Sequence, residues 1–290
     1  MRFYVLYCGC KVDKDLAATF FSEVNIMTGA IIGDIAGSRF EFDNYRAKDF
    51  DFFTGNCFFT DDTVMTLAVA KALNKYKKVT DYEDFKKTLV KCMHKVGIRY
   101  PDCGYGGRFY VWITEKKTEP YNSFGNGSAM RVSPVAWYAS SLEEAENLAR
   151  ATAEVTHNHP EGIKGAVSVA GATYLARTGH TMDEIREYVS RFYNIDFTLD
   201  EIRPVYGFYE TCQDSVPQAF EAFFESVSFE DAVRNAISIG GDSDTIAAIT
   251  GAVAEGYYGI DEAMKKQATE YLDSRLMKIY SEFIKKTEER

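Results

Sequence analysis

The sequence lacks a basic stripe and a long apolar run, and each absence excludes a class of protein. The 290 residues include 33 lysines and arginines against 43 acidic residues, which gives a net charge of −10. A field of this sign repels phosphate backbones, so we expect no nucleic acid as a primary partner. No stretch approaches the roughly 20 apolar residues needed to cross a bilayer, so we expect no membrane partner either.

A disulfide framework is also missing. The six cysteines are scattered without a CxxC pair, a pattern typical of reduced thiols in a cytoplasmic protein. Residues 1–26 have little periodicity, and their apolar run is too short for a signal sequence. We therefore predict an extension of doubtful structure at 1–26 before a domain at 27–290, with Met27 as a hypothetical native start. No signal points to a particular oligomeric state.

Helical periodicity dominates the remaining chain, and strand patterns are weak. This favours one compact all-α domain of many helices. The region 98–140 is expected to consist of loops, and charged amphipathic turns are expected after 260. The predicted helices lie at 27–37, 61–77, 81–97, 142–155, 159–179, 181–193, 216–227, 229–240 and 244–259.

Glycines repeat along the first predicted helix. Gly29, Gly33 and Gly37 are four residues apart and therefore share one helical face. Because glycine has no side chain, this face predicts the close approach of a second helix backbone.

Two adjacent aspartates open the helix expected at 61–77. If Thr60 caps this helix, Asp61 and Asp62 lie in its first turn, where acidic side chains stabilise the helix dipole by about 0.3–1 kcal/mol each. Helix capping is therefore one explanation of the pair, and a bound cation is the other.

A second acidic pair favours the cation. Asp242 and Asp244 precede the helix expected at 244–259, where a single Ser or Asp would suffice as a cap. Four carboxylates at two buried helix starts would repel each other, and two divalent ions would balance their charge. The candidate ligands are all hard oxygen donors, which favours Mg²⁺ or Mn²⁺: Thr60, Asp61, Asp62, Asp242, Asp244 and Thr245.

The order of the motifs resembles that of the ADP-ribosylglycohydrolase family. TDDT at 60–63 and GGDSDT at 240–245 carry most of the resemblance. GAIIGDIAGSRFEF at 29–42, FGNGSAMR at 124–131 and the Thr156-His157 pair match further family motifs in the same order. The resemblance runs from about Thr28 to Tyr258 and does not cover residues 1–26 or the C-terminal helices.

The resemblance implies a compact all-α fold with a dinuclear Mg²⁺ or Mn²⁺ centre that removes ADP-ribose from modified side chains. The six oxygen ligands would hold both ions beside the ribose diol. Glu41 stands at the acidic position of the family motif and is expected, on a mobile loop, to act as a general acid/base or a gate. A metal-bound water activated by Asp61 or Asp242 is the alternative base. An exposed glutamate in an ion pair is the structural alternative for Glu41.

The same resemblance implies a loop beside the ribose, at 124–131, and one histidine at the diphosphate or ribose. His157 is read as this pocket residue. The run Tyr105-Gly106-Gly107-Arg108 is expected to line the diphosphate path. Residues expected to contact the substrate are Tyr105, Gly106, Gly125, Asn126, Gly127, Ser128, Met130 and His157. The partner would be ADP-ribose or an ADP-ribosylated protein.

Two other functions remain open from the sequence. A catalytically weak ADP-ribose-binding module would not need two ions, and it would be expected to lack the acidic residue at position 41. A two-metal phosphohydrolase would usually place a His or Lys near the ions, and neither aspartate motif has one beside it.

Overall fold

The computed structural model describes residues 26–290, so the extension predicted for 1–26 lies outside the described residues except for Ile26. Helices are the only regular elements of this part of the chain, which confirms the all-α prediction. They are α2 (Thr28–Gly37), α3 (Asp61–Leu73), α4 (Tyr82–Gly97), α5 (Gly107–Thr114), α6 (Gly127–Met130), α7 (Ser133–Tyr138), α8 (Leu142–Glu154), α9 (Pro160–Arg177), α10 (Met182–Ser190), α11 (Leu199–Ile202), α12 (Cys212–Phe224), α13 (Phe229–Ile237), α14 (Ser243–Tyr258), α15 (Glu262–Thr269) and α16 (Ser274–Glu288).

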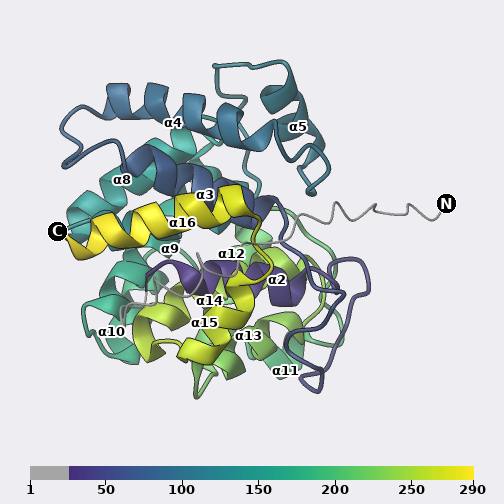
Figure 1. Cartoon of the computed structure of the whole chain (residues 1–290). Coiled ribbons are helices and arrows are strands. Elements are labelled where there is room, and N and C mark those ends of the chain that lie inside the picture. The colour runs from purple at the N-terminus through teal and green to yellow at the C-terminus, as the bar shows by residue number, and fades with distance from the viewer. Residues whose placement is uncertain (1–25) are drawn as a thin grey trace.

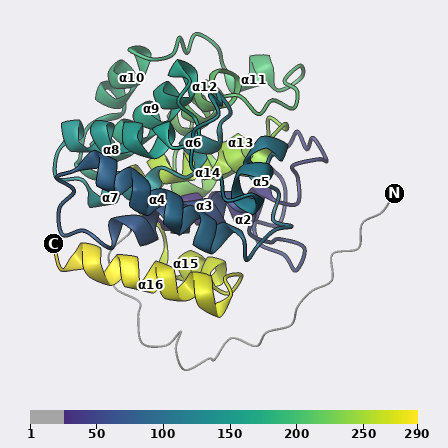
Figure 2. The ribbon, with the colours of Figure 1, turned by 90° about the horizontal axis from the view of Figure 1, so that it is seen from above.

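Helices α2 and α14 form the centre of the molecule, and the other helices surround them in both views (Figures 1 and 2). The predicted glycine face makes their contact. A Cβ on Gly29 would lie 2.2 Å from the carbonyl oxygen of Gly251, and one on Gly33 would lie 2.0 Å from that of Ala247. At the last turn, a Cβ on Gly37 would lie 2.6 Å from the Cα of Asp244. The two helices are therefore antiparallel, and the end of α2 touches the start of α14.

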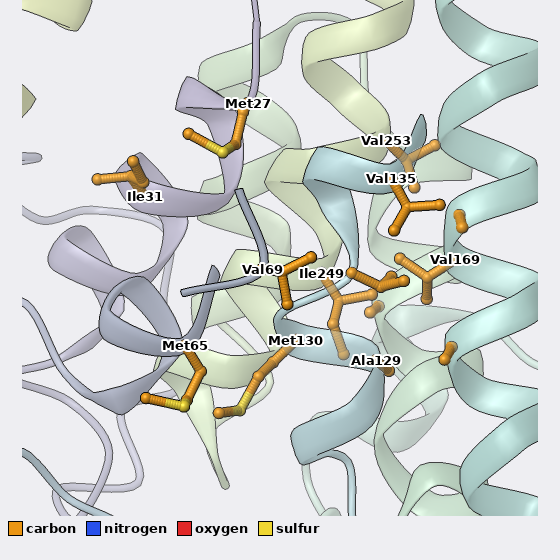
Figure 3. Packing of buried hydrophobic residues seen from close by; sticks show 14 of the residues in the cluster. Met27, Ile31, Met65, Val69, Ala129, Met130, Val135, Val169, Ile249 and Val253 are labelled. Atoms are coloured by element: carbon orange, nitrogen blue, oxygen red, sulfur yellow. The ribbon is translucent and has the colours of Figure 1, made fainter. Parts of the chain in front are cut away.

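Helix α3 packs against α2, and its side chains are buried almost all round. Its buried residues include Val64, Leu67, Ala68 and Ala72. Methionines and branched residues from several helices fill the core around it, including α3, α6 and α14 (Figure 3). Both aspartate motifs therefore begin helices that the core holds in place.

The prediction that 98–140 is all loop is wrong. This stretch contains the short helices α5, α6 and α7. Helix α5 exists because Phe109, Trp112 and Ile113 can bury one face against the core. Sequence periodicity is weak over eight residues or fewer, and tertiary packing stabilises such short helices.

Several helix boundaries also differ from the prediction. Helix α3 ends at Leu73 rather than near 77, and α12 begins at Cys212 instead of 216. Pro217 lies inside α12, although proline is most typical of a first turn. Thr60 caps α3 as predicted, and Asp81 and Ser141 cap α4 and α8. Within the described residues, no helix is both long enough and apolar enough to span a bilayer.

Candidate metal centre and substrate cavity

The start of α3 has a cap that does not use the acidic pair. Thr60 Oγ1 accepts the backbone N–H of Asp62 at 3.3 Å. The carboxylate of Asp34, buried in α2, accepts the backbone N–H groups of Thr60 and Thr63, each at 3.0 Å, and the Thr60 hydroxyl at 2.7 Å. Asp34 and Thr60 therefore satisfy the helix N-terminus, and capping does not explain Asp61 and Asp62.

Asp62 has a buried carboxylate oxygen without a hydrogen-bond partner in residues 26–290. Its side chain is buried, and its Oδ1 has no hydrogen-bond partner among the described residues. A buried acceptor without a partner is costly, so it indicates a missing positive group. This atom is what a bound cation would satisfy.

The second acidic pair sits on a glycine turn at the start of α14. Gly240 and Gly241 have φ angles of +75° and +73°, which side chains other than glycine rarely adopt. The turn brings Asp242 to the N-cap, where it makes no side-chain cap. Asp242 Oδ2 instead accepts a hydrogen bond from Asn126 Nδ2 at 2.6 Å. This carboxylate is thus oriented by the 125–127 loop.

The two acidic motifs and Glu41 meet in one cavity of about 260 Å³. Oxygens of Glu41, Asp242 and Asp244 all lie within 4.8 Å of one another. Asp61 and Asp62 line the same cavity, together with Thr245. The structure therefore brings together residues that are up to about 200 positions apart.

Burial and mutual repulsion raise the pKa of each of these carboxyl groups. The pKa of Glu41 rises to about 8, mainly because of burial and then because of Asp244. That of Asp242 rises to about 7, again mainly through burial. Burial followed by the charge of Asp244 raises the pKa of Asp61 and Asp62 well above its usual range. Burial, then Asp242, does the same for Asp244.

Among residues 26–290, no cationic side chain forms an ion pair with this cluster of five carboxylates. Crowded carboxylates, a hydroxyl at Thr245 and an unpartnered oxygen on Asp62 form a hard-oxygen donor set. Such a set fits Mg²⁺ or Mn²⁺ and does not fit a soft metal.

The two predicted threonine ligands differ in their surroundings. Thr245 lines the cavity, and its hydroxyl donates to Asp62 Oδ2 at 3.1 Å. The Thr60 hydroxyl donates to Asp34 and accepts from Asp62, so at most one lone pair is left for an ion. Its role as a ligand stays a prediction.

Some residues of the predicted substrate loops line the cavity, and others make hydrogen bonds within the fold. Gly106, Gly125, Asn126, Gly127, Met130 and His157 line the cavity. The Ser128 hydroxyl donates to the carbonyl of Gly162 at 2.7 Å, which ties α6 to α9. The Tyr105 hydroxyl donates to the carbonyl of Gly97 at 3.2 Å. Ser128 and Tyr105 thus make contacts that hold the loops, while their contact with substrate stays a prediction.

Some cavity residues were not selected from the sequence. Arg131 ends the FGNGSAMR motif, whose glycines were selected instead, and Gly104 directly precedes the predicted Tyr105-Gly106 pair. The others lie in segments without a recognisable motif, so only the tertiary structure identifies them. The cavity residues not selected are Gly104, Phe109, Tyr121, Ser123, Arg131 and Glu210.

Two cationic side chains also line the cavity. Arg108 and Arg131 both line it, together with His157. Burial lowers the pKa of His157 well below its usual value, and the charges of Arg131 and Arg108 lower it further. The imidazole is therefore neutral at pH 7, and the two guanidinium groups supply the charge.

Comparison with known proteins agrees with this geometry. The family model described as ADP-ribosylglycohydrolase matches residues 24–289. ADP-ribosylhydrolase ARH3 of Mus musculus is 28% identical over 72% of this chain and 72% of its own. ADP-ribosyl-[dinitrogen reductase] glycohydrolase of Rhodospirillum rubrum is 27% identical over 70% of each chain.

A solved structure titled ADP-ribosylglycohydrolase-related protein complex has the same fold. It aligns with a TM-score of 0.61 at 20% identity and covers 91% of this chain and 98% of its own. The family match and these relatives define the chain as a hydrolase that acts on glycosyl bonds. The chain belongs to the ADP-ribosylglycohydrolase family.

Proposed function

We propose that this enzyme releases ADP-ribose from a modified protein side chain and that it depends on two Mg²⁺ or Mn²⁺ ions. The observation that carries the proposal is the meeting of Glu41, Asp242 and Asp244 within 4.8 Å, in the cavity that Asp61 and Asp62 also line. These aspartates and Thr245 would hold the ions, and Thr60 is proposed to add its free lone pair. When bound, the ions would neutralise the cluster and polarise the ribose.

Glu41 is proposed to move the proton that hydrolysis requires. It follows α2 on a loop and is half-buried beside Asp242 and Asp244, and no ion pair of the described chain engages it. In this role its carboxyl group would take a proton from the attacking water or give one to the leaving atom.

The glycine loop, His157 and Arg108 are proposed to bind the diphosphate. Gly125, Gly127, His157 and Arg108 all line the cavity. Backbone N–H groups of glycine-rich turns and arginine are suited to phosphate oxygens. This arrangement would place the ribose next to Glu41 and the aspartates.

Release of ADP-ribose from modified peptides tests the proposal directly. Arginine-linked and serine-linked substrates would be incubated with Mg²⁺, Mn²⁺ or EDTA, and free ADP-ribose would be measured by chromatography. We expect release with metal and none with EDTA, and the preferred peptide would identify the linkage.

Asp242→Asn and Asp196→Asn form a matched pair for this assay. Asp242 lies in the acidic cluster, whereas Asp196 is exposed in a loop and does not line the cavity. Asp242→Asn should abolish metal-dependent release, and Asp196→Asn should not change it. Binding of ADP-ribose with metal but no release from any peptide would instead support a binding module.

A further inference from the structure

Arg131 is a buried arginine that lies beside Thr156 and His157. It ends the FGNGSAMR motif, is 1% exposed and lines the cavity. Burial lowers its pKa to about 10, so it remains a cation at neutral pH. Its Nη2 donates to the carbonyl of Thr152 at 3.1 Å and to Thr156 Oγ1 at 2.7 Å.

The Thr156 hydroxyl contacts both Arg131 and His157. Its Oγ1 lies 2.8 Å from Nδ1 of the imidazole. A guanidinium group only donates, so the Thr156 oxygen is the acceptor in its contact with Arg131. The hydroxyl hydrogen then remains for a second contact, and within residues 26–290 the acceptor in reach is Nδ1.

This direction of donation determines where the ring holds its proton. A neutral imidazole carries one proton, and an Nδ1 that accepts leaves that proton on Nε2. The reverse arrangement, with Nδ1–H donating to Thr156, would leave the buried hydroxyl hydrogen without an acceptor. Thr156 is fully buried, so water does not readily replace that acceptor.

The Nε2 side of the ring faces the glycine loop of the cavity. A Cβ on Gly127 would lie 3.2 Å from Nε2, and one on Gly125 would lie 3.6 Å away. Both glycines line the same cavity as His157. A proton on Nε2 is thus presented where an anionic oxygen of the ligand would lie.

We propose that Arg131 and Thr156 are positioning residues that hold His157 as the neutral Nε2–H tautomer, so that it donates to an anionic oxygen of the ligand. The anion itself, a diphosphate oxygen, rests on the proposed function. The tautomer does not, because it follows from contacts within this chain. Burial and the two arginines keep the ring neutral, which agrees with a donor that does not titrate near pH 7.

Nitrogen NMR of the imidazoles tests the tautomer without any substrate. The chain has four histidines, and His157→Gln assigns the signal of interest. In the full-length protein with Mg²⁺ near pH 7, we expect an unprotonated Nδ1 and a protonated Nε2. An Nδ1–H tautomer or a doubly protonated ring would overturn the proposal.

Thr156→Val then removes the hydroxyl but keeps the side-chain shape. We expect a mixture of tautomers and about tenfold weaker binding of ADP-ribose in titration calorimetry. Thr156→Ser restores the hydroxyl and should restore both readouts. Thr173→Val is the matched control, because Thr173 is equally buried and its hydroxyl bonds only the carbonyl of Val169, within α9.

The outcomes separate this proposal from the function it extends. If Thr156→Val and Thr173→Val give the wild-type spectrum alike, the positioning role is wrong. If the wild type shows the Nε2–H tautomer but releases no ADP-ribose, only the proposed function fails. If Thr156→Val does not fold, the tautomer in the wild-type spectrum and the spectrum of Thr156→Ser test the proposal instead.

Discussion

The hydroxyl of Thr245 donates a hydrogen bond of 3.1 Å to Oδ2 of Asp62, across 183 residues of sequence. This bond joins the start of α14 to the start of α3. It also uses one oxygen of Asp62 and leaves Oδ1, buried, without a partner. The two acidic motifs therefore form one unit whose charge the described side chains do not balance.

We predict that the metal-free protein loses stability as pH rises. The pKa of Glu41 is about 8 and that of Asp242 about 7 in the folded protein, against roughly 4 for unfolded carboxyl groups. The folded state thus binds more protons than the unfolded state between these values, so stability is present at low pH and falls as pH rises towards 8. Thermal unfolding in EDTA across this range should show a falling Tm.

Excess Mg²⁺ is the control for that measurement. Bound cations favour the ionised carboxylates, so they should remove most of the slope and stabilise the protein more at pH 8 than at pH 5. A Tm in EDTA that stays level or rises over this range would contradict the crowding of charge that the structure indicates.

Asp62→Asn should stabilise the metal-free protein. The change removes one of the crowded charges, while the amide oxygen can still accept from Thr245. We expect a gain of roughly 1–3 kcal/mol at pH 8 in EDTA and loss of the stabilisation by Mg²⁺. Asp196→Asn, at an exposed position, should change neither quantity. Destabilisation of the metal-free protein by Asp62→Asn would instead make Asp62 a structural residue.

Glu41→Gln should separate catalysis from binding. Loss of a general acid/base lowers kcat by about 10²–10⁴-fold, while the cavity that holds ADP-ribose keeps its shape. Steady-state kinetics and calorimetric titration with ADP-ribose measure the two effects. Asp43→Asn, an exposed change on the same loop, is the control. If Glu41→Gln weakens binding as much as it lowers kcat, Glu41 serves binding or gating and not proton transfer.

Gly33→Ala should disrupt the contact between α2 and α14. The new Cβ would lie 2.0 Å from the carbonyl oxygen of Ala247, so one backbone must move. Overpacking of this kind costs about 1–3 kcal/mol or more, and the movement would displace Asp242 and Asp244. Thermal unfolding with and without Mg²⁺ measures both effects. Gly55→Ala, whose Cβ would meet no atom within 4 Å, should be close to wild type.

Much of the fold could be predicted because its signals are local. The four-residue glycine spacing in α2 predicts a close helix contact, since both periodicity and side-chain size are visible in the sequence. The short helices α5, α6 and α7 could not be predicted, because eight residues or fewer carry too little periodicity. Their stability comes from burial of residues such as Trp112 in a core formed by distant segments.

The candidate site was also predictable from the sequence only in part. The sequence alone determined which side chains are available: two acidic pairs at helix starts, Glu41 after the glycine helix, and a glycine loop with His157. The tertiary structure decided their partners. It assigned the cap of α3 to Asp34, left Asp62 Oδ1 unpartnered and set Arg131 behind Thr156 and His157. These outcomes depend on burial and on contacts between distant segments, which local sequence patterns do not encode.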